Sequence, residues 1–124
     1  MLRQIAGFAG AVFLLLAPVG EAVAQAKQDF SLVNATGYPL RAVFVAPSKS
    51  DDWEDDVLGK DIMADGETVD IHFNRADKSC GWDLKVTYDD DGTSAVWYGI
   101  DLCTVSRITI KYNRATDTST ATYD

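Results

Sequence analysis

The sequence has few of the residues that most enzyme active sites need. Its 124 residues include one histidine and two cysteines, and it has no Gly-x-Ser-x-Gly, Cys-x-x-Cys, phosphate-binding loop or haem-attachment motif. Basic residues are scarce, since 11 Lys and Arg stand against 19 Asp and Glu, a formal net charge of -8. This balance argues against binding to nucleic acid or to anionic membrane surfaces, whose phosphates would repel the chain. The length fits one domain at most, which excludes two-domain enzymes and large barrels.

Long hydrophobic runs are absent except at the N-terminus. A positive charge precedes an apolar run over residues 5–19, and Ala-Val-Ala at residues 22–24 has the small-x-small pattern that a signal peptidase accepts. The run is about 15 residues long and contains Pro18, whereas a membrane-spanning helix needs about 20. We therefore predict a cleaved signal peptide over residues 1–24 and export through the general secretory route to the periplasm or beyond. A single domain over residues 25–124, without membrane insertion, would follow; an uncleaved anchor is the alternative.

The chain has one pair of cysteines, Cys80 and Cys103, and both lie in the predicted mature domain. Asp89-Asp90-Asp91-Gly92 predicts a hairpin turn between two strand-like runs. The cysteines are almost symmetric about this turn, so pairing outward from it brings them nearly opposite each other. In an oxidising compartment we predict a structural disulfide, worth about 3 kcal/mol in the chain-entropy model. A metal-thiolate pair and a redox dithiol are the alternatives, but the chain lacks a second cluster of metal ligands.

Apolar and polar residues alternate along most of the mature chain, which is typical of half-buried strands. About six or seven short strands separated by turns predict an all-β fold, an antiparallel β-sandwich with a barrel as the alternative. In the clearest stripe, Trp82 and every second residue after it face inward, so we expect Trp82 in the core. The candidate strands are residues 29–35, 39–46, 68–74, 82–88, 94–100, 107–113 and 118–123, the last of which could also fray.

One segment interrupts the alternation and predicts a short acidic helix over residues 48–59. Asp51 and Glu54 have capping-box spacing, with Asp in place of the usual Ser or Thr. Gly59 suits the left-handed position that follows many helices. We expect Trp53 to anchor this helix on the sheets.

Two acidic segments form the candidate cation-binding or partner-binding surface. Calcium prefers about six to eight oxygen ligands, and clustered carboxylates on loops supply them. The spacing around Gly92 does not fit an EF-hand loop, because Thr87 and Tyr98 occupy ligand positions. The alternative is a solvated acidic surface, since acids favour helix N-termini and Asp-Gly favours turns. The residues are Asp51, Asp52, Glu54, Asp55, Asp56, Asp89, Asp90 and Asp91.

Two polar motifs each have a functional and a structural interpretation. His72 has Asp70 as a neighbour on the polar face of its strand, but a Ser-His-Asp site also needs a positioned serine and an oxyanion hole. An exposed polar residue is the simpler interpretation of His72. Asn34-x-Thr36 matches a glycosylation sequon, but Asn-x-Thr-Gly also forms turns, and we interpret it as a turn.

Trp97 is the candidate aromatic contact. It alternates with Ala95 and Gly99, whose small side chains could leave room for a ligand or for the backbone of a partner. Core packing is the alternative role for Trp97.

Several short motifs lie along the predicted mature domain, and Trp-x-x-Asp-x-Leu-Gly and the two-cysteine pattern are fairly specific. The motifs are Asn34-x-Thr36-Gly37, Trp53-x-x-Asp56-x-Leu58-Gly59, Cys80-x-x-Asp83-Leu84, Asp91-Gly92 and Asp101-Leu102-Cys103. Together they resemble a group of small exported bacterial proteins without established activity. The resemblance implies a β-rich domain, supports the disulfide and provides no catalytic residue. Some members are labelled argininosuccinate lyase, a large helical tetrameric enzyme that a short β-patterned chain cannot form.

Three functional hypotheses follow from the sequence. The first is a noncatalytic exported binding or interaction module for a protein or small ligand, without a cofactor. The second is a calcium-binding or calcium-responsive β domain that uses the acidic segments. The third is a small hydrolase that uses His72 and neighbouring acids, for which a chain this short leaves little room.

Overall fold

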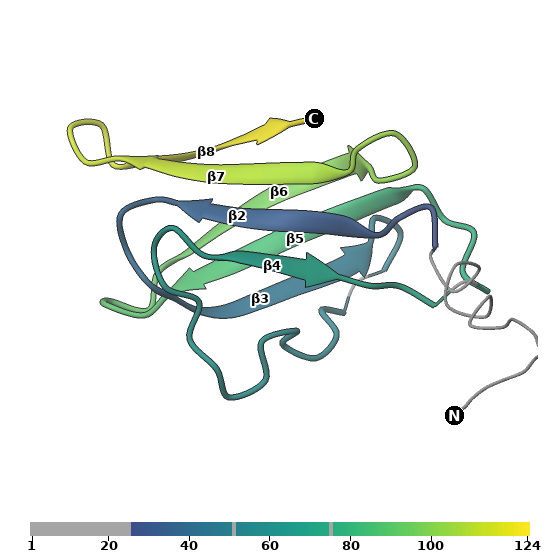
Figure 1. The fold of residues 1–124 in the computed structure, drawn as a ribbon, viewed down its shortest axis with the longest axis horizontal. Coiled ribbons are helices and arrows are strands. Elements are labelled where there is room, and N and C mark those ends of the chain that lie inside the picture. The colour runs from purple at the N-terminus through teal and green to yellow at the C-terminus, as the bar shows by residue number, and fades with distance from the viewer. Residues whose placement is uncertain (1–25, 51, 75) are drawn as a thin grey trace, which may run out of the picture.

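The computed structural model describes residues 26–50, 52–74 and 76–124, which form seven strands and no helix (Figure 1). The predicted signal peptide over residues 1–24 lies outside these residues. All seven predicted strands are confirmed, and the largest difference is at residues 68–74, where the strand already ends at Ile71. The strands are β2 (Phe30–Ala35), β3 (Leu40–Pro47), β4 (Thr68–Ile71), β5 (Gly81–Tyr88), β6 (Ser94–Asp101), β7 (Arg107–Asn113) and β8 (Thr118–Tyr123).

The strands form two sheets that face each other in a sandwich-like arrangement (Figure 1). One sheet has the order β4-β2-β7-β8 and the other β3-β5-β6. The prediction of a purely antiparallel fold is wrong at one pair, because β2 runs parallel to β7 with Leu32 opposite Ile108. This pair joins the first described strand to a strand far along the chain, so no hairpin turn marks it in the sequence.

The core lies between the two sheets. Leu32 and Ile108 from one sheet and Leu84 and Val86 from the other are at most 1% exposed. Each lies at an alternate position of its strand, because successive side chains of a strand point to opposite faces. Burying side chains of this size contributes roughly 1.5–3 kcal/mol each. Trp82 is 4% exposed, which confirms its predicted place in the core.

The predicted acidic helix over residues 48–59 is wrong, since the described part of that segment forms bends and turns. The carboxylate of Asp56 accepts hydrogen bonds from the N–H groups of Val43 (2.8 Å) and Leu58 (2.9 Å). The N–H of Val57 donates to the carbonyl of Val43 (2.8 Å). Val43 belongs to β3, an edge strand whose outer N–H and C=O groups need partners. Asp56 and Val57 provide them, so the chain follows the strand edge instead of coiling into a helix.

Trp53 packs on the outer face of the β3-β5-β6 sheet rather than anchoring a helix. The ammonium of Lys85 lies 5.4 Å from the ring centroid of Trp53 and 5.0 Å from that of Phe44. Farther along the same edge, Leu40 and Met63 form an isolated β-bridge, and Met63 is 1% exposed. The connection from β3 to β4 therefore covers the edge of β3, which protects it from pairing with another chain.

A β-bulge in β6 decides which of its side chains face the core. Two residues of β6 lie opposite Asp83, and Gly99 takes a φ of 68°, which glycine adopts readily. The Asp83 carboxylate accepts a hydrogen bond from the N–H of Gly99 (2.9 Å) and so holds the bulge. The bulge interrupts the predicted alternation of Trp97 with Gly99 and turns Ile100 into the core, where it is 6% exposed.

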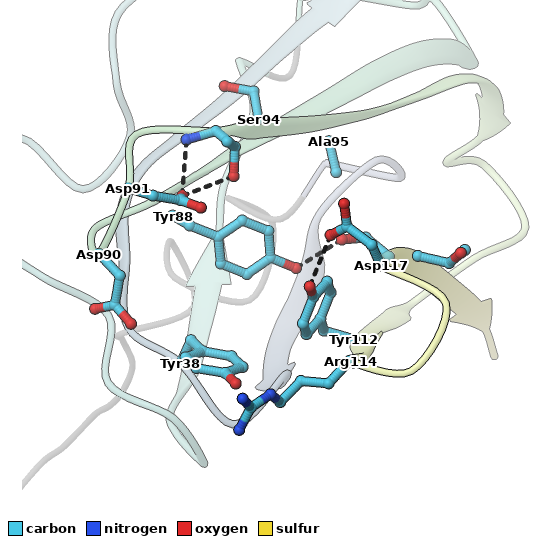
Figure 2. A pocket seen from close by; sticks show the side chains of 12 residues that line it. Tyr38, Tyr88, Asp90, Asp91, Ser94, Ala95, Tyr112, Arg114 and Asp117 are labelled. Carbon is cyan, nitrogen blue, oxygen red and sulfur yellow. Dashed lines mark hydrogen bonds between the residues drawn. The ribbon is translucent and has the colours of Figure 1, made fainter.

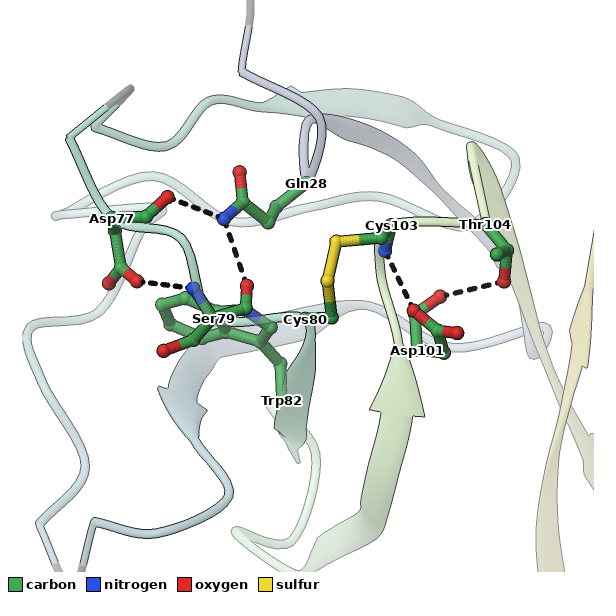
Figure 3. Close-up of a disulfide and its surroundings, with 8 residues drawn as sticks. All are labelled: Gln28, Asp77, Ser79, Cys80, Trp82, Asp101, Cys103 and Thr104. Carbon is green, nitrogen blue, oxygen red and sulfur yellow. Dashed lines mark hydrogen bonds between the residues drawn. A yellow bond between two sulfur atoms is a disulfide. The ribbon is translucent and has the colours of Figure 1, made fainter.

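The predicted disulfide between Cys80 and Cys103 is confirmed, with the two Cα atoms 5.1 Å apart (Figure 3). Cys80 precedes β5 and Cys103 follows β6, and the N–H of Leu102 donates to the carbonyl of Cys80 (2.9 Å). Among the described residues, no helix has the length and apolarity needed to cross a membrane.

Candidate functional site

A cavity of about 540 Å³ opens at the end of the sandwich farthest from the disulfide (Figure 2). It lies between the β5–β6 turn and the β7–β8 turn, which Figure 1 shows at the same end of the molecule. Its size is in the range that small-molecule sites occupy. We call it the tyrosine pocket, and its lining residues are Tyr38, Tyr88, Asp90, Asp91, Thr93, Ser94, Ala95, Tyr112, Arg114, Asp117, Thr118 and Ser119.

Strand periodicity places two of the three tyrosines in this pocket, and a turn supplies the third. Tyr88 ends the inward-facing stripe of β5, and Tyr112 lies two residues after the buried Ile110 on the same face of β7. Tyr38 comes from the turn before β3. The ring centroid of Tyr112 lies 5.6 Å from that of Tyr38 and 5.8 Å from that of Tyr88, with the ring planes inclined by 80° and 59°. The inclined rings form walls rather than a parallel stack.

The tyrosine hydroxyls are held by polar side chains of the β7–β8 hairpin (Figure 2). The Tyr112 hydroxyl donates to the carboxylate of Asp117 (2.7 Å), and this hydrogen bond raises the pKa of Tyr112 to about 12. The Tyr88 and Ser119 hydroxyls lie 2.7 Å apart in a hydrogen bond. Burial is the main cause of the raised pKa of Tyr88, which is 8% exposed. Both phenols therefore stay protonated at neutral pH.

Charged side chains surround the mouth of the tyrosine pocket. The Asp91 carboxylate accepts hydrogen bonds from the N–H (3.0 Å) and hydroxyl (2.8 Å) of Thr93, which hold the pKa of Asp91 below its usual value. Asp90, Asp117 and Arg114 are exposed beside it. The lining thus carries three carboxylates against one guanidinium.

The structure separates the two acidic segments that the sequence analysis groups together. Asp90 and Asp91 line the tyrosine pocket. The described carboxylates of residues 52–56 belong to the segment along β3, and Asp51 lies outside the described residues. Within the described chain, the only three potential metal ligands within 4.8 Å of one another are Cys80, Asp101 and Cys103. The two sulfur atoms of that group form the disulfide, so this set is not a calcium site.

His72 lies at the surface and contacts a different acid from the one that the sequence suggests. Its Nδ1 is 3.3 Å from the carboxylate of Asp29, and its side chain is 69% exposed. The hydroxyl of Ser31 donates to Asp70 (2.7 Å). The serine proton is thus directed at a carboxylate and not at the imidazole, which is not the order of a Ser-His-Asp site.

Motif residues of the resemblance hold the fold together. Asn34 is fully buried, and its side-chain N–H groups donate to the carbonyls of Tyr38 (2.8 Å), Met63 (3.2 Å) and Ala64 (3.2 Å). Its side-chain oxygen accepts from the N–H and hydroxyl of Thr36. These contacts agree with the turn interpretation of Asn34-x-Thr36, since a buried amide cannot carry a glycan in the folded protein. Asp56 and Asp83 likewise use their carboxylates to accept backbone hydrogen bonds.

Trp97 is half-buried and packs against the core from β6. Ala95, two residues before it, lines the tyrosine pocket. A contact of Trp97 with a partner stays a prediction.

The acidic turn predicted from the sequence supplies two of the three acids of this pocket, Asp90 and Asp91. Asp117 and the three tyrosines were not predicted, and Tyr88 was expected only as an inward-facing residue of its strand. The sequence does contain a signal for the tyrosines, because Tyr rather than Phe or Leu stands at strand ends beside polar turns. A tyrosine there can bury its apolar ring in the core and place its hydroxyl at the solvent-exposed edge.

Comparisons with protein-family models, curated proteins and solved structures found no match to this chain. The resemblance to small exported bacterial β-rich proteins therefore stays a prediction, and the function is argued from the site alone.

Proposed function

We propose that this chain is an exported, noncatalytic binding module whose ligand site is the tyrosine pocket. The observation that carries the proposal is the clustering of Tyr38, Tyr88 and Tyr112 around an open cavity whose rim carries both carboxylates and a guanidinium. Ligand pockets combine apolar and aromatic walls with a few placed polar groups in this way.

The protonation states of the pocket support binding over catalysis. The raised pKa of Tyr112 keeps its phenol neutral, so it is a poor general base. The lowered pKa of Asp91 keeps its carboxylate charged, so it is a poor general acid. Both shifts move the pKa away from neutral pH, where general acid–base catalysis is most effective, and so favour a binding role for these groups.

Export is supported by two independent features. The N-terminal pattern over residues 1–24 predicts a signal peptide, and the Cys80–Cys103 disulfide is of the kind that persists in oxidising compartments.

The test is an amide chemical-shift titration of the oxidised protein recovered after export. The probes are choline, acetate, glucose and glycine, each added to millimolar concentration at constant ionic strength. We expect at least one probe to shift the amides of Thr93, Ser94 and Ser119 saturably. Tyr112→Leu is expected to abolish that response. Tyr98→Leu is the matched control, because Tyr98 is 74% exposed and lies outside the pocket.

Absence of a saturable shift with all four probes would overturn the proposal. So would shifts spread evenly over both ends of the sandwich, or a response that Tyr98→Leu removes as completely as Tyr112→Leu.

A further inference from the structure

We propose that the tyrosine pocket selects a positively charged alkylammonium group, such as a quaternary ammonium or the side chain of a methylated lysine. This inference rests on the proposed function, because it names the ligand class of the same site. The inference goes beyond the proposed function because it assigns the charge of the ligand and names the side chains that interact with that charge.

The charges around the pocket favour a cation. Asp90, Asp91 and Asp117 line it against the single Arg114, and the whole chain carries a formal net charge of -8. A cleft lined by one sign of charge concentrates ligands of the opposite sign. An anionic ligand in the pocket would be repelled by three carboxylates and attracted by one guanidinium.

The arrangement of the rings favours an ammonium over a neutral ligand. A cation is attracted to the faces of aromatic rings within about 6 Å of their centroids, and several inclined rings form a cage around it. The ring of Tyr112 is inclined by 80° to that of Tyr38 and by 59° to that of Tyr88. The hydrogen bond from Tyr112 to the carboxylate of Asp117 also pushes electron density into the Tyr112 ring, which strengthens its attraction for a cation.

The same chemistry is already present on the outer face of the β3-β5-β6 sheet. There the Lys85 ammonium lies over the rings of Phe44 (5.0 Å) and Trp53 (5.4 Å). Lys85 makes both of the cation–π contacts found in the described part of the chain. A cation from outside would bind to the ring surfaces that face the cavity, since Tyr112 also packs directly against Tyr38 and Tyr88.

Two polar residues of the β7–β8 turn determine how strongly a cation is held. Asp117 adds a negative charge beside Tyr112, and it has a φ of 52°, a left-handed conformation that Asn also tolerates. Asp117→Asn therefore removes the charge and keeps the turn. Arg114 is an exposed positive charge on the same rim, so it opposes a cationic ligand and would help an anionic one.

The experiment measures binding of choline and of its neutral carbon isostere, in which a tert-butyl group replaces the trimethylammonium group. Each compound is titrated into the oxidised protein recovered after export, and binding is followed by calorimetry and by amide chemical shifts. We expect choline to bind about tenfold more tightly than the isostere. Asp117→Asn is expected to weaken choline binding about fivefold, and Arg114→Gln to strengthen it about twofold. Asp52→Asn is the matched control, with the same loss of charge on an exposed residue outside the pocket.

The outcomes separate this inference from the proposed function. Equal binding of choline and its isostere at the pocket amides would overturn charge selection while leaving the pocket as a ligand site. Binding of glucose or acetate without choline would do the same, and Arg114→Gln would then weaken acetate. If none of these probes shifts the pocket amides, the proposed function and this inference both fail.

Discussion

Each end of the sandwich has a trio of aromatic rings packed against one another, and only the trio at the pocket end carries hydroxyl groups. At the disulfide end, Phe73 lies between Phe30 and Trp82, with ring centroids 6.1 Å and 4.7 Å away. These rings have no hydroxyl, and their one polar atom, the indole N–H of Trp82, donates to the carbonyl of Ser79 (2.8 Å). The end is closed further by Gln28, 2% exposed, whose side chain donates to the carbonyls of Asp77 and Ser79 (Figure 3).

At the other end the trio consists of tyrosines, and the sandwich stays open. Tyr38, Tyr88 and Tyr112 pack at similar distances, but their rings line a cavity and the hydroxyls of the last two reach Ser119 and Asp117. A phenol needs a polar partner or water, so it is placed where the core meets solvent.

The comparison teaches that aromatic clustering alone does not identify a site. Phe and Trp rings with satisfied polar atoms close one end and stabilise the fold. Tyr rings beside charged turns line an open cavity at the other end, which we propose as a ligand site. We therefore expect substitutions at the disulfide end to change stability and substitutions at the pocket end to change binding.

The largest effect is expected from Trp82→Ala. It removes a ring that is 4% exposed, its contact with Phe73 and a partly buried hydrogen bond. The free energy of unfolding should fall by about 3–5 kcal/mol, as for other buried aromatic residues. Urea denaturation followed by circular dichroism measures it. A loss below about 1 kcal/mol would show that the ring trio of the closed end is not part of the core.

Loss of the disulfide is expected to have the next largest effect. Replacing Cys80 and Cys103 together by alanine opens a loop of sequence separation 23. In the chain-entropy model this lowers the free energy of unfolding by about 3 kcal/mol. Thermal denaturation of the variant beside the oxidised protein measures the change. Binding at the distant tyrosine pocket should persist below the lower melting temperature, and its complete loss in the folded variant would contradict the separation of the two ends.

Alkaline pH is expected to act on the pocket end. Tyr112 has a pKa of about 12 in the folded protein against 10.0 for an unperturbed tyrosine, so the unfolded chain releases this proton first. The stabilisation from Tyr112 is therefore complete below pH 10 and is lost as the pH rises from 10 to about 12. Melting temperatures and phenolate absorbance across this range measure the effect. Tyr112→Phe should lose less stability than the wild-type protein over the same pH range. If the melting temperatures of the two proteins fall equally steeply with pH, Tyr112 is not the group responsible.

The strands were predictable because each depends on a local pattern. Alternation of apolar and polar residues predicted most of them, and the symmetry of Cys80 and Cys103 about one turn predicted the disulfide. The parallel pairing of β2 with β7 was not predictable, because it joins distant segments without a turn motif. The helix prediction rested on the spacing of Asp51 and Glu54 and on Gly59, and it failed because the Asp56 carboxylate holds the segment along the edge of β3.

The candidate site was only half predictable. Asp90 and Asp91 stood out as acids on a turn, but nothing local brings them near Tyr112 or Asp117. These residues come together because the β5–β6 and β7–β8 turns, although they belong to different sheets, lie at the same end of the sandwich (Figure 1). The sequence also grouped the acids of residues 51–56 with those of the 89–91 turn, although of these acids only Asp90 and Asp91 line the pocket.

The central claim is tested most directly by one matched pair of substitutions, Phe73→Leu and Tyr112→Leu. Both residues are half-buried members of an aromatic trio, one at each end. For each variant the free energy of unfolding is measured together with the affinity of the probe that titrates the wild-type pocket. Phe73→Leu is predicted to lose about 1–2 kcal/mol of stability with unchanged affinity. Tyr112→Leu is predicted to lose less stability and most of the binding. If Phe73→Leu weakens the probe as much as Tyr112→Leu does, the two ends are not functionally distinct and the account is wrong.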